Sequence, residues 1–361
     1  MALPTKTDEW VLAAPTGVEN AYRLNKGVPL PALGNKDVLL EIKAVSLNFR
    51  DVAIAMGAYP LPTKFPLVPC CDASAVVLAT GASVTSVAAG DGVIVLPAPL
   101  FQSGHMTTAT FGAPGDGFMP GLLRRHAVLP ASWVARFPRF LSFVEASTLG
   151  VAGVTAWNIL APYGLGAPDA AVVKPGSWVL TQGTGAVSLF AAEFAVRLGA
   201  VVVGTTSSDA KKHWLTDLGV TTVINYNEDP LWGETARRLT PDGEGVDLVV
   251  DVGGTGTLGE SLKAIRYDGT VAVTGFLTGD STAGPSVMDV LPRAANVRGV
   301  LAGSRAHYEE MARMIEQWQF HPKVDDEVFQ FEDANTAVQY LAAQKHIGKV
   351  VIEVSPESRA A

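Results

Sequence analysis

A glycine-rich turn between two apolar segments is the feature that most restricts the fold of this chain. Residues 179–182 read as a buried strand, Gly183 and Gly185 follow in a Gly-Thr-Gly turn, and the run 189–199 reads as a helix. A second apolar run of strand length, 200–206, follows. Glycines let the backbone approach a pyrophosphate closely, and the N–H groups at a helix start favour an anion. The sequence therefore predicts a phosphate-binding turn in a βαβ unit, the alternative being a tight turn in another α/β domain.

The segment from 177 to 303 alternates strands and helices in the manner of a doubly wound parallel sheet. Its strands are dense in Val, Ile and Leu, as expected where both faces of a sheet are covered. Helices are predicted between the strands, including 210–218 and 258–266. The six predicted strands are 177–182, 201–206, 222–226, 246–252, 270–276 and 297–302.

The N-terminal part has a different pattern. Short apolar runs at 37–44, 75–79 and 92–96 are separated by Pro and Gly clusters, which is typical of an antiparallel β domain. Residues 97–121 are expected to form a long loop. The C-terminal segment is expected to contain two helices and a final strand, at 308–319, 333–344 and 349–354.

Composition and charge narrow the class of protein. The 361 residues are 48% hydrophobic, enough for two domains with separate cores. The net charge of −8 has no long like-charge runs, which argues against nucleic-acid and membrane partners, and no apolar stretch is long enough to span a bilayer. The N-terminus lacks a secretion pattern, and the two cysteines, Cys70 and Cys71, are adjacent, where an ordinary disulfide is unfavourable. We expect a cytoplasmic protein that acts on a small-molecule substrate.

Short motifs along nearly the whole chain follow the order and spacing of a known family. They are Leu-Asn-Phe-Arg-Asp at 47–51, Gly-Ala-Tyr-Pro at 57–60, Glu-Ala-Ser at 145–147, Gly-Val-Thr-Ala-Trp at 153–157, the glycine turn, Ser-Ser-Asp-Ala-Lys at 207–211, Ile-Asn-Tyr at 224–226 and His-Ile-Gly-Lys-Val-Val at 346–351. This series resembles the medium-chain dehydrogenase/reductase superfamily, and within it the zinc-free branch of quinone oxidoreductases and enoyl reductases. It is also similar to a subgroup named alcohol dehydrogenases.

The resemblance implies an α/β protein of two domains. A GroES-like antiparallel β domain would comprise residues 1–155 and be completed by 305–361. A Rossmann domain, 156–304, with a doubly wound parallel six-stranded sheet would be inserted between these parts. The resemblance also implies a cleft where the domains meet and, from family dimers, a homodimer paired through the edge strand 297–302.

The positions that bind zinc in metal-dependent relatives carry other residues here. Those relatives place a Cys, a His followed by Glu, and a further Cys or Asp around a catalytic ion. The resemblance puts Asn48, the pair Cys71 and Asp72, and a residue near Val151 at these positions. One thiol and one carboxylate fall short of the three protein ligands that catalytic zinc requires. We expect no metal, with Cys70 and Cys71 as buried packing residues and a redox or metal role as the alternative.

The residues after the second Rossmann strand favour NADPH. A site that prefers NAD has an Asp or Glu about 20 residues past the first glycine, whereas 203–206 here is Val-Gly-Thr-Thr. Ser207 and Lys211 supply a hydroxyl and a cation where relatives hold the 2′-phosphate, and Tyr226 matches a family position at the adenosine end. Asp209 is expected to cap the helix that follows. The alternative for Lys211 is a solvated helix residue.

Further cofactor contacts are expected at the glycine turn and at the carboxyl ends of the strands, where open α/β sheets bind ligands. The resemblance adds a threonine that packs under the nicotinamide ring and a lysine of the C-terminal motif. The expected positions are Gly183, Thr184, Gly185, Ala186, Val187, Gly253, Gly275, Phe276, Leu277, Gly303 and Ser304, and, from the resemblance, Thr155 and Lys349.

Hydrogen bonding can replace a metal where the hydride acceptor is already activated. Hydride addition to an enone or enoyl thioester leaves charge on the carbonyl oxygen, and each preorganised donor stabilises such charge by about 3 kcal/mol. A quinone is easier still, whereas a saturated alcohol must lose a proton without zinc or an evident base. The sequence therefore favours an NADPH-dependent reductase of α,β-unsaturated carbonyls, enoyl thioesters or quinones. The alternatives are a zinc-free alcohol or aldehyde oxidoreductase and a non-catalytic NADPH-binding protein.

Two residues are the candidates for contact with the substrate. Tyr59 matches a family tyrosine in the loop that faces the nicotinamide, and its phenol can donate to an oxyanion. Its alternative role is a rim aromatic that shapes the pocket. Asn48, at the former ligand position, can hydrogen-bond the substrate or the nicotinamide ribose, while Arg50 and Asp51 are expected to form an ion pair or order that loop.

Overall fold

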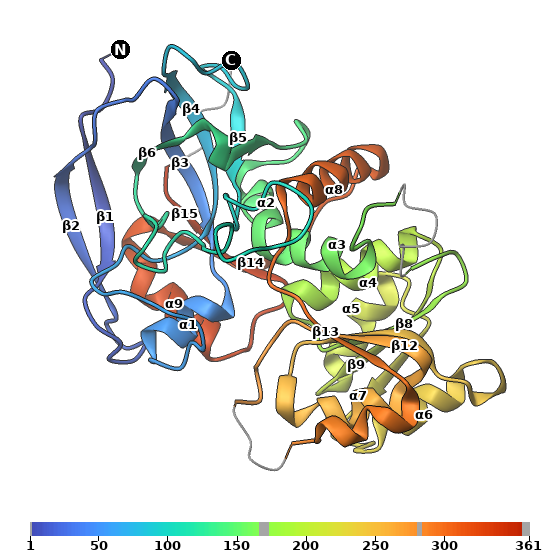
Figure 1. The fold of residues 1–361 in the computed structure, drawn as a ribbon. Coiled ribbons are helices and arrows are strands. Elements are labelled where there is room, and N and C mark those ends of the chain that lie inside the picture. Colours follow the sequence, from blue (N-terminus) through green and yellow to red (C-terminus); the bar gives the residue numbers. More distant parts are fainter. Residues whose placement is uncertain (1, 166–172, 280–283, 356–361) are drawn as a thin grey trace. The chain divides into compact units, whose positions relative to one another are not determined.

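The chain folds into two compact units. The computed structural model describes residues 2–165, 173–279 and 284–355. One unit comprises Met1–Val151 together with Gly303–Ala361, and the other comprises Ala152–Ala302. The units thus divide after residues 151 and 302, whereas the sequence led us to expect boundaries a few residues later, after 155 and after 304. The first unit is thus assembled from both ends of the chain, so that the blue and red parts of the ribbon belong together in Figure 1.

The first unit is built on a mainly antiparallel sheet. Its strand order is β14-β15-β3-β4-β5-β7, β6 also pairs with β3, and β1 and β2 form a separate pair. The pairing of β14 with β15 is parallel. The strands are β1 Lys6–Leu12, β2 Tyr22–Pro29, β3 Asp37–Ser46, β4 Asp72–Thr80, β5 Gly92–Val95, β6 His126–Pro130, β7 Val134–Arg136, β14 Val324–Gln330 and β15 Lys349–Glu353. The helices are α1 Phe49–Ala55, α2 Phe143–Ala146, α8 Arg305–Trp318 and α9 Ala334–Ala342.

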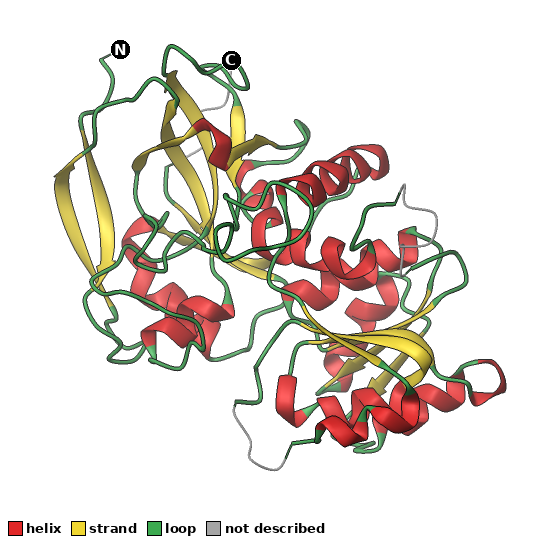
Figure 2. Ribbon diagram, viewed as in Figure 1, coloured by secondary structure: helices red, strands yellow, loops and turns green. Residues whose placement is uncertain are grey.

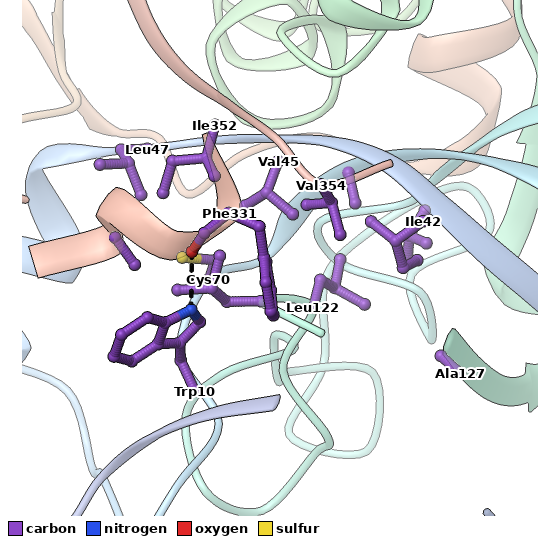
Figure 3. Packing of buried hydrophobic residues seen from close by; sticks show 14 of the residues in the cluster. Trp10, Ile42, Val45, Leu47, Cys70, Leu122, Ala127, Phe331, Ile352 and Val354 are labelled. Carbon is purple, nitrogen blue, oxygen red and sulfur yellow. Dashed lines mark hydrogen bonds between the residues drawn. The ribbon is translucent and has the colours of Figure 1, made fainter. Parts of the chain in front are cut away.

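The core of this unit joins residues from both ends of the chain. Figure 3 shows Trp10 and Phe331 packed together, and the Trp10 indole N–H donates to the Phe331 carbonyl oxygen over 2.8 Å. Cys70 lies in the same apolar cluster and is fully buried. Burying each large apolar side chain contributes about 1.5 to 3 kcal/mol, so this shared core holds the C-terminal segment in place. Cys70 is therefore a packing residue, as its sequence context predicted.

The second unit contains the predicted six-stranded parallel sheet. Its order is β10-β9-β8-β11-β12-β13. Figure 2 shows helices on both faces of the sheet, and α3 packs with α4 as α6 does with α7. The strands are β8 Trp178–Gln182, β9 Val201–Thr206, β10 Thr222–Asn225, β11 Val246–Asp251, β12 Ile265–Val273 and β13 Asn296–Gly299. The helices are α3 Val154–Leu160, α4 Ala186–Arg197, α5 Lys212–Asp217, α6 Trp232–Leu239 and α7 Leu258–Ala264.

Three expected strand ends were wrong. β13 ends at Gly299 rather than at 302, and Ala302 has a φ of +49°, which is not an extended conformation. β12 begins at Ile265, five residues before the expected 270, and ends at Val273, three residues before the expected 276; its pairing with β11 is irregular between Val246 and Leu248. Within the described ranges, no helix is long and apolar enough to cross a bilayer.

Candidate functional site

The glycine turn lies where the strand order reverses. β9 and β10 lie on one side of β8, and β11, β12 and β13 on the other, so the ends of β8 and β11 flank a switch point of the kind that binds ligands. Gly183 has a φ of +73°, and a Cβ at Gly183 or Gly185 would meet no atom within 4 Å. The Leu189 N–H donates to the Gly185 carbonyl at the start of α4, so the N–H groups of 186–188 precede the first helical bond. Open space and free donors fit a dinucleotide pyrophosphate.

Buried polar side chains fix the ends of β8 and β11 beneath this turn. Asp251 is fully buried and accepts hydrogen bonds from Ser261 Oγ at 2.6 Å and Thr257 Oγ1 at 2.7 Å. Gln182 Nε2 donates to Asp251 Oδ2 at 3.2 Å, and Ser188 Oγ donates to the Gln182 carbonyl at 2.6 Å. Sequence reasoning missed this network. Its one signal was a polar residue at the end of each of two apolar strands.

The expected cap at Asp209 was wrong. Ser208 is the N-cap of the short 3-10 helix Asp209–Lys211, and Asp209 lies inside its first turn. The Asp209 carboxylate pairs with the Lys212 ammonium and accepts from Asn225 Nδ2 at 3.3 Å. The negative charge of Asp209 is therefore compensated by Lys212 and Asn225. Among the described residues, no acceptor pairs with the Lys211 ammonium.

The structure places most of the other expected cofactor contacts in the second unit. Ser207 and Tyr226 follow β9 and β10, which are neighbouring strands, and Thr155 is buried in α3. The rest of this group are Thr184, Ala186 and Val187 at the turn, Gly253 after β11, and Gly275, Phe276 and Leu277 after β12. Gly303 and Ser304, which were also expected to contact the cofactor, do not lie in the second unit. They belong to the first unit, and the buried Ser304 caps α8 by accepting from the His307 N–H at 3.2 Å.

A buried polar network in the first unit joins the residues that the resemblance equates with metal ligands. Asp72 begins β4 and is fully buried. Its Oδ1 accepts from the Val151 N–H at 2.7 Å, and its Oδ2 accepts from Asn48 Nδ2 at 3.0 Å. Lys349, at the start of β15, places Nζ 3.2 Å from Asp72 Oδ2 and donates to Asn48 Oδ1 at 2.7 Å and to the Leu47 carbonyl at 2.8 Å. Lys349 was expected to contact the cofactor, but these hydrogen bonds go to protein acceptors.

Local backbone structure brings these groups together. Asn48 is the N-cap of α1, and its backbone N–H donates to Asp51 Oδ2 at 2.8 Å. Val151 lies in a π-helical turn, Leu149–Gly153, of the kind that often marks a functional site. A Cβ at Gly150 would overlap Asp72 Oδ1, so the approach of the carboxylate to this turn requires a glycine.

These residues do not fit a zinc ion. Burial raises the pKa of the Cys71 thiol to about 12, against the opposing effect of Arg50, so the thiolate that zinc needs is disfavoured. Both oxygens of Asp72 already accept hydrogen bonds, and an ammonium lies against one of them. In residues 2–165, 173–279 and 284–355, no three His, Cys, Asp or Glu side chains gather closely enough to hold a metal.

Tyr59 and Asn48 flank α1 in the first unit. The Arg50 guanidinium, in the first turn of α1, lies 5.4 Å from the centroid of the Tyr59 ring and donates to the Pro114 carbonyl at 3.0 Å. Arg50 Nη1 lies 4.0 Å from Asp51 Oδ1, the ion pair expected from the sequence. Two donors of this buried guanidinium, Nε and Nη2, have no partner among the described residues. A cation held over its ring orders Tyr59 within the loop.

Comparisons with known proteins agree with this architecture. Residues 34–139 match the model of the alcohol dehydrogenase GroES-like domain, and residues 186–317 match that of the zinc-binding dehydrogenases. A zinc-type alcohol dehydrogenase-like protein of Schizosaccharomyces pombe is 39% identical over 323 residues, which are 88% of this chain and 91% of the relative. A quinone oxidoreductase-like protein 2 homolog of Nematostella vectensis is 25% identical over 331 residues, 89% of this chain and 82% of the relative.

A solved structure of similar extent carries the same fold. The crystal structure of a candidate alcohol dehydrogenase from Sinorhizobium meliloti 1021 shares 34% of its sequence with this chain, with a TM-score of 0.85. The match covers 98% of this chain and 100% of that one. The GroES-like domain and the Rossmann sheet expected from the sequence are thereby confirmed. The chain belongs to the medium-chain dehydrogenase/reductase superfamily of oxidoreductases.

Proposed function

We propose that this oxidoreductase uses NADPH to reduce an activated double bond or a quinone without a metal ion. The observation that carries the proposal is the donor set around Asp72. A zinc enzyme needs three protein ligands with free lone pairs. At the corresponding positions this chain has the neutral thiol of Cys71, the Asp72 carboxylate, which already accepts hydrogen bonds, and the Asn48 amide, which accepts from the Lys349 ammonium. Hydrogen bonds suffice for a carbonyl oxygen whose double bond is conjugated, because the charge that develops there is already delocalised.

The second unit supports NADPH as the reductant. NADPH, when bound, supplies the hydride. The N–H groups of residues 186–188, which precede the first hydrogen bond of α4, would hold the pyrophosphate. Ser207 and Lys211 would hold the 2′-phosphate with a hydroxyl and a cation, and Lys212 compensates the charge of Asp209. Thr155, which is buried in α3, would pack under the nicotinamide ring, as the family resemblance implies. In the segment 207–211, which directly follows β9, Asp209 is the one carboxylate, and it pairs with Lys212.

The first unit supplies the groups that meet the substrate oxygen. Tyr59 donates its phenol hydrogen to the oxygen on which charge develops, and Asn48 donates an amide N–H. Each preorganised donor contributes about 3 kcal/mol to the stabilisation of that charge. The acceptor is an α,β-unsaturated carbonyl, an enoyl thioester or a quinone. Quinone reduction also matches the name of the Nematostella vectensis relative, a quinone oxidoreductase-like protein 2 homolog.

Alcohol or aldehyde oxidoreduction is the second candidate, because the Schizosaccharomyces pombe relative is named for a zinc-type alcohol dehydrogenase. The two candidates separate in a single experiment. Purified protein is offered NADPH with a panel of quinones, enones, enoyl thioesters and aldehydes, and NADP⁺ with alcohols, while NADPH absorbance is followed. Zinc is measured on the same sample. Turnover of enones or quinones by zinc-free protein supports the proposal, and alcohol oxidation that requires stoichiometric zinc contradicts it.

Two further features belong to the proposal. The free, buried thiols of Cys70 and Cys71 suit a reducing compartment such as the cytoplasm. The edge strand β13 suits a homodimer, because it lies at the end of the sheet with exposed apolar side chains beside it.

A further inference from the structure

The Lys349 ammonium is one of the most deeply buried charges in the described chain. Its side chain is 2% exposed, and that of Asp72 is 0% exposed. An ammonium has three N–H donors, and three acceptors surround this one: the Leu47 carbonyl, Asn48 Oδ1 and Asp72 Oδ2. A buried charge persists only when it is paired and hydrogen-bonded. Each N–H of the Lys349 ammonium therefore has an acceptor, and its charge is paired with that of Asp72.

This cation lies among the residues that the resemblance equates with metal ligands. Asn48 and Val151 both donate hydrogen bonds to Asp72, and Lys349 donates one to Asn48. The family model that matches residues 186–317 is named for zinc binding, yet the lone pairs that zinc would need are directed to N–H donors.

The ammonium also decides which way the Asn48 amide faces. Oδ1 points to Lys349 and Nδ2 to Asp72. The flipped amide would set N–H groups against an ammonium and an oxygen against a carboxylate, so only one orientation is favourable. Nδ2 carries two hydrogens, and only one is used by Asp72. Among the described residues, none accepts the other hydrogen, and Asn48 is only partly buried.

We propose that Lys349 is a positioning residue that takes the electrostatic place of a metal ion: it neutralises Asp72 and holds the Asn48 amide with one N–H directed at the substrate oxygen. The neutralising role is independent of the reaction. The role in directing Asn48 rests on the proposed function. A preorganised donor of this kind strengthens only as charge forms on the oxygen, so it acts on kcat more than on substrate binding.

The test compares Lys349→Met, Asp72→Asn and the double variant with wild type. Lys43→Met is the matched control, because Lys43 is another buried lysine of the first unit, paired with Glu41 at 2.9 Å. Lys349→Met leaves a buried carboxylate unpaired, so its urea midpoint is expected to fall below that of the double variant, in which both charges are gone. Equal midpoints for the single and double variants would overturn the neutralising role.

Kinetics with NADPH and the best acceptor test the second role. The folded double variant is expected to lose about 100-fold in kcat, the scale of one lost oxyanion donor, with little change in the KM for NADPH. Lys43→Met is expected to keep the wild-type kcat. A double variant that regains the wild-type kcat would show that Lys349 only balances charge and would overturn the positioning role.

Zinc uptake tests the inference on wild type alone. Protein incubated with excess zinc chloride and desalted is expected to retain none at this place. One equivalent retained by wild type and lost on Cys71→Ser substitution would overturn the inference. Wild type that turns over no acceptor with NADPH would contradict the proposed function, whereas the midpoints and the zinc content would still report on Lys349.

Discussion

Asp72 Oδ2 and Lys349 Nζ lie 3.2 Å apart, although 277 residues separate them in the chain. The sheet of the first unit explains the contact. Ser46 of β3 is opposite Asp72 of β4 on one side and opposite Val351 of β15 on the other. The C-terminal strand β15 thus places Lys349 beside Asn48, which follows β3 in the chain, and beside Asp72, which begins the neighbouring strand β4. The site in this unit is complete only when both ends of the chain have folded together.

Lys211→Ala should weaken NADPH binding selectively. A charged hydrogen bond to the 2′-phosphate contributes about 1.5 to 3 kcal/mol, so the Kd for NADPH should rise about 10-fold to 150-fold. The Kd for NADH, which lacks that phosphate, should not change. Fluorescence titration measures both. Lys263→Ala is the matched control, because Lys263 lies on α7 of the same unit and pairs with Glu260. Equal affinity of wild type for NADPH and NADH would contradict the assignment.

The parallel sheet could be predicted because each of its strands carries its own signal. Strands buried on both faces must be almost entirely apolar, so β8, β9 and β11 were located from Val and Leu content alone. Their ends were less certain, since they depend on single residues. β13 ends at Gly299, and the apolar residues Val300 and Leu301 that follow gave no sign that the strand had ended.

The first unit was harder to predict because its strands are half-exposed or carry runs of charge. β14 begins Val-Asp-Asp-Glu, a run that gives no strand signal, and it is held by its parallel pairing with β15. The candidate site shows the same limit. The motif around Lys349 could be recognised, but its three acceptors come from residues near 48 and 72, and sequence spacing does not reveal such a long-range contact.

Tyr59→Phe should lower turnover without weakening NADPH binding. The substitution removes the phenol hydroxyl and keeps the ring that Arg50 faces at 5.4 Å. Loss of one donor to the developing oxyanion should reduce kcat about 100-fold. Steady-state kinetics with an enone or a quinone, together with NADPH titration, separate the two effects. An unchanged kcat would mean that Tyr59 shapes the pocket as an aromatic wall and does not donate.

Val297→Glu should convert a dimer into a monomer. Val297 is 42% exposed on β13, one of the two edge strands of the Rossmann sheet, and the nearby Leu301 is 50% exposed. Pairing of two edge strands would bury these side chains, and a carboxylate there would oppose the pairing. Light scattering after size exclusion gives the mass. Val328→Glu is the matched control, because Val328 is 37% exposed on β14, the edge strand of the other sheet. A monomeric wild type would contradict the dimer.

Glu193→Gln should stabilise the second unit at neutral to alkaline pH but not in acid. Burial in α4 raises the pKa of Glu193 from 4.5 to about 7, although Arg197 at 3.5 Å acts in the opposite direction. Between these two pKa values the folded state holds a proton that the unfolded chain has released, so stability is greatest below the unfolded pKa and falls as the pH rises to the folded one.

A glutamine cannot ionise, so the variant should avoid this loss. Its gain in free energy of unfolding should be at most about 3 kcal/mol near pH 8 and close to zero below about pH 4.5. Urea unfolding at several pH values measures the difference. Glu234→Gln on α6 is the matched control, because the Glu234 side chain is 47% exposed. A gain that is the same at every pH would mean that the glutamine packs better, and that the ionisation of Glu193 does not limit the stability of this helix.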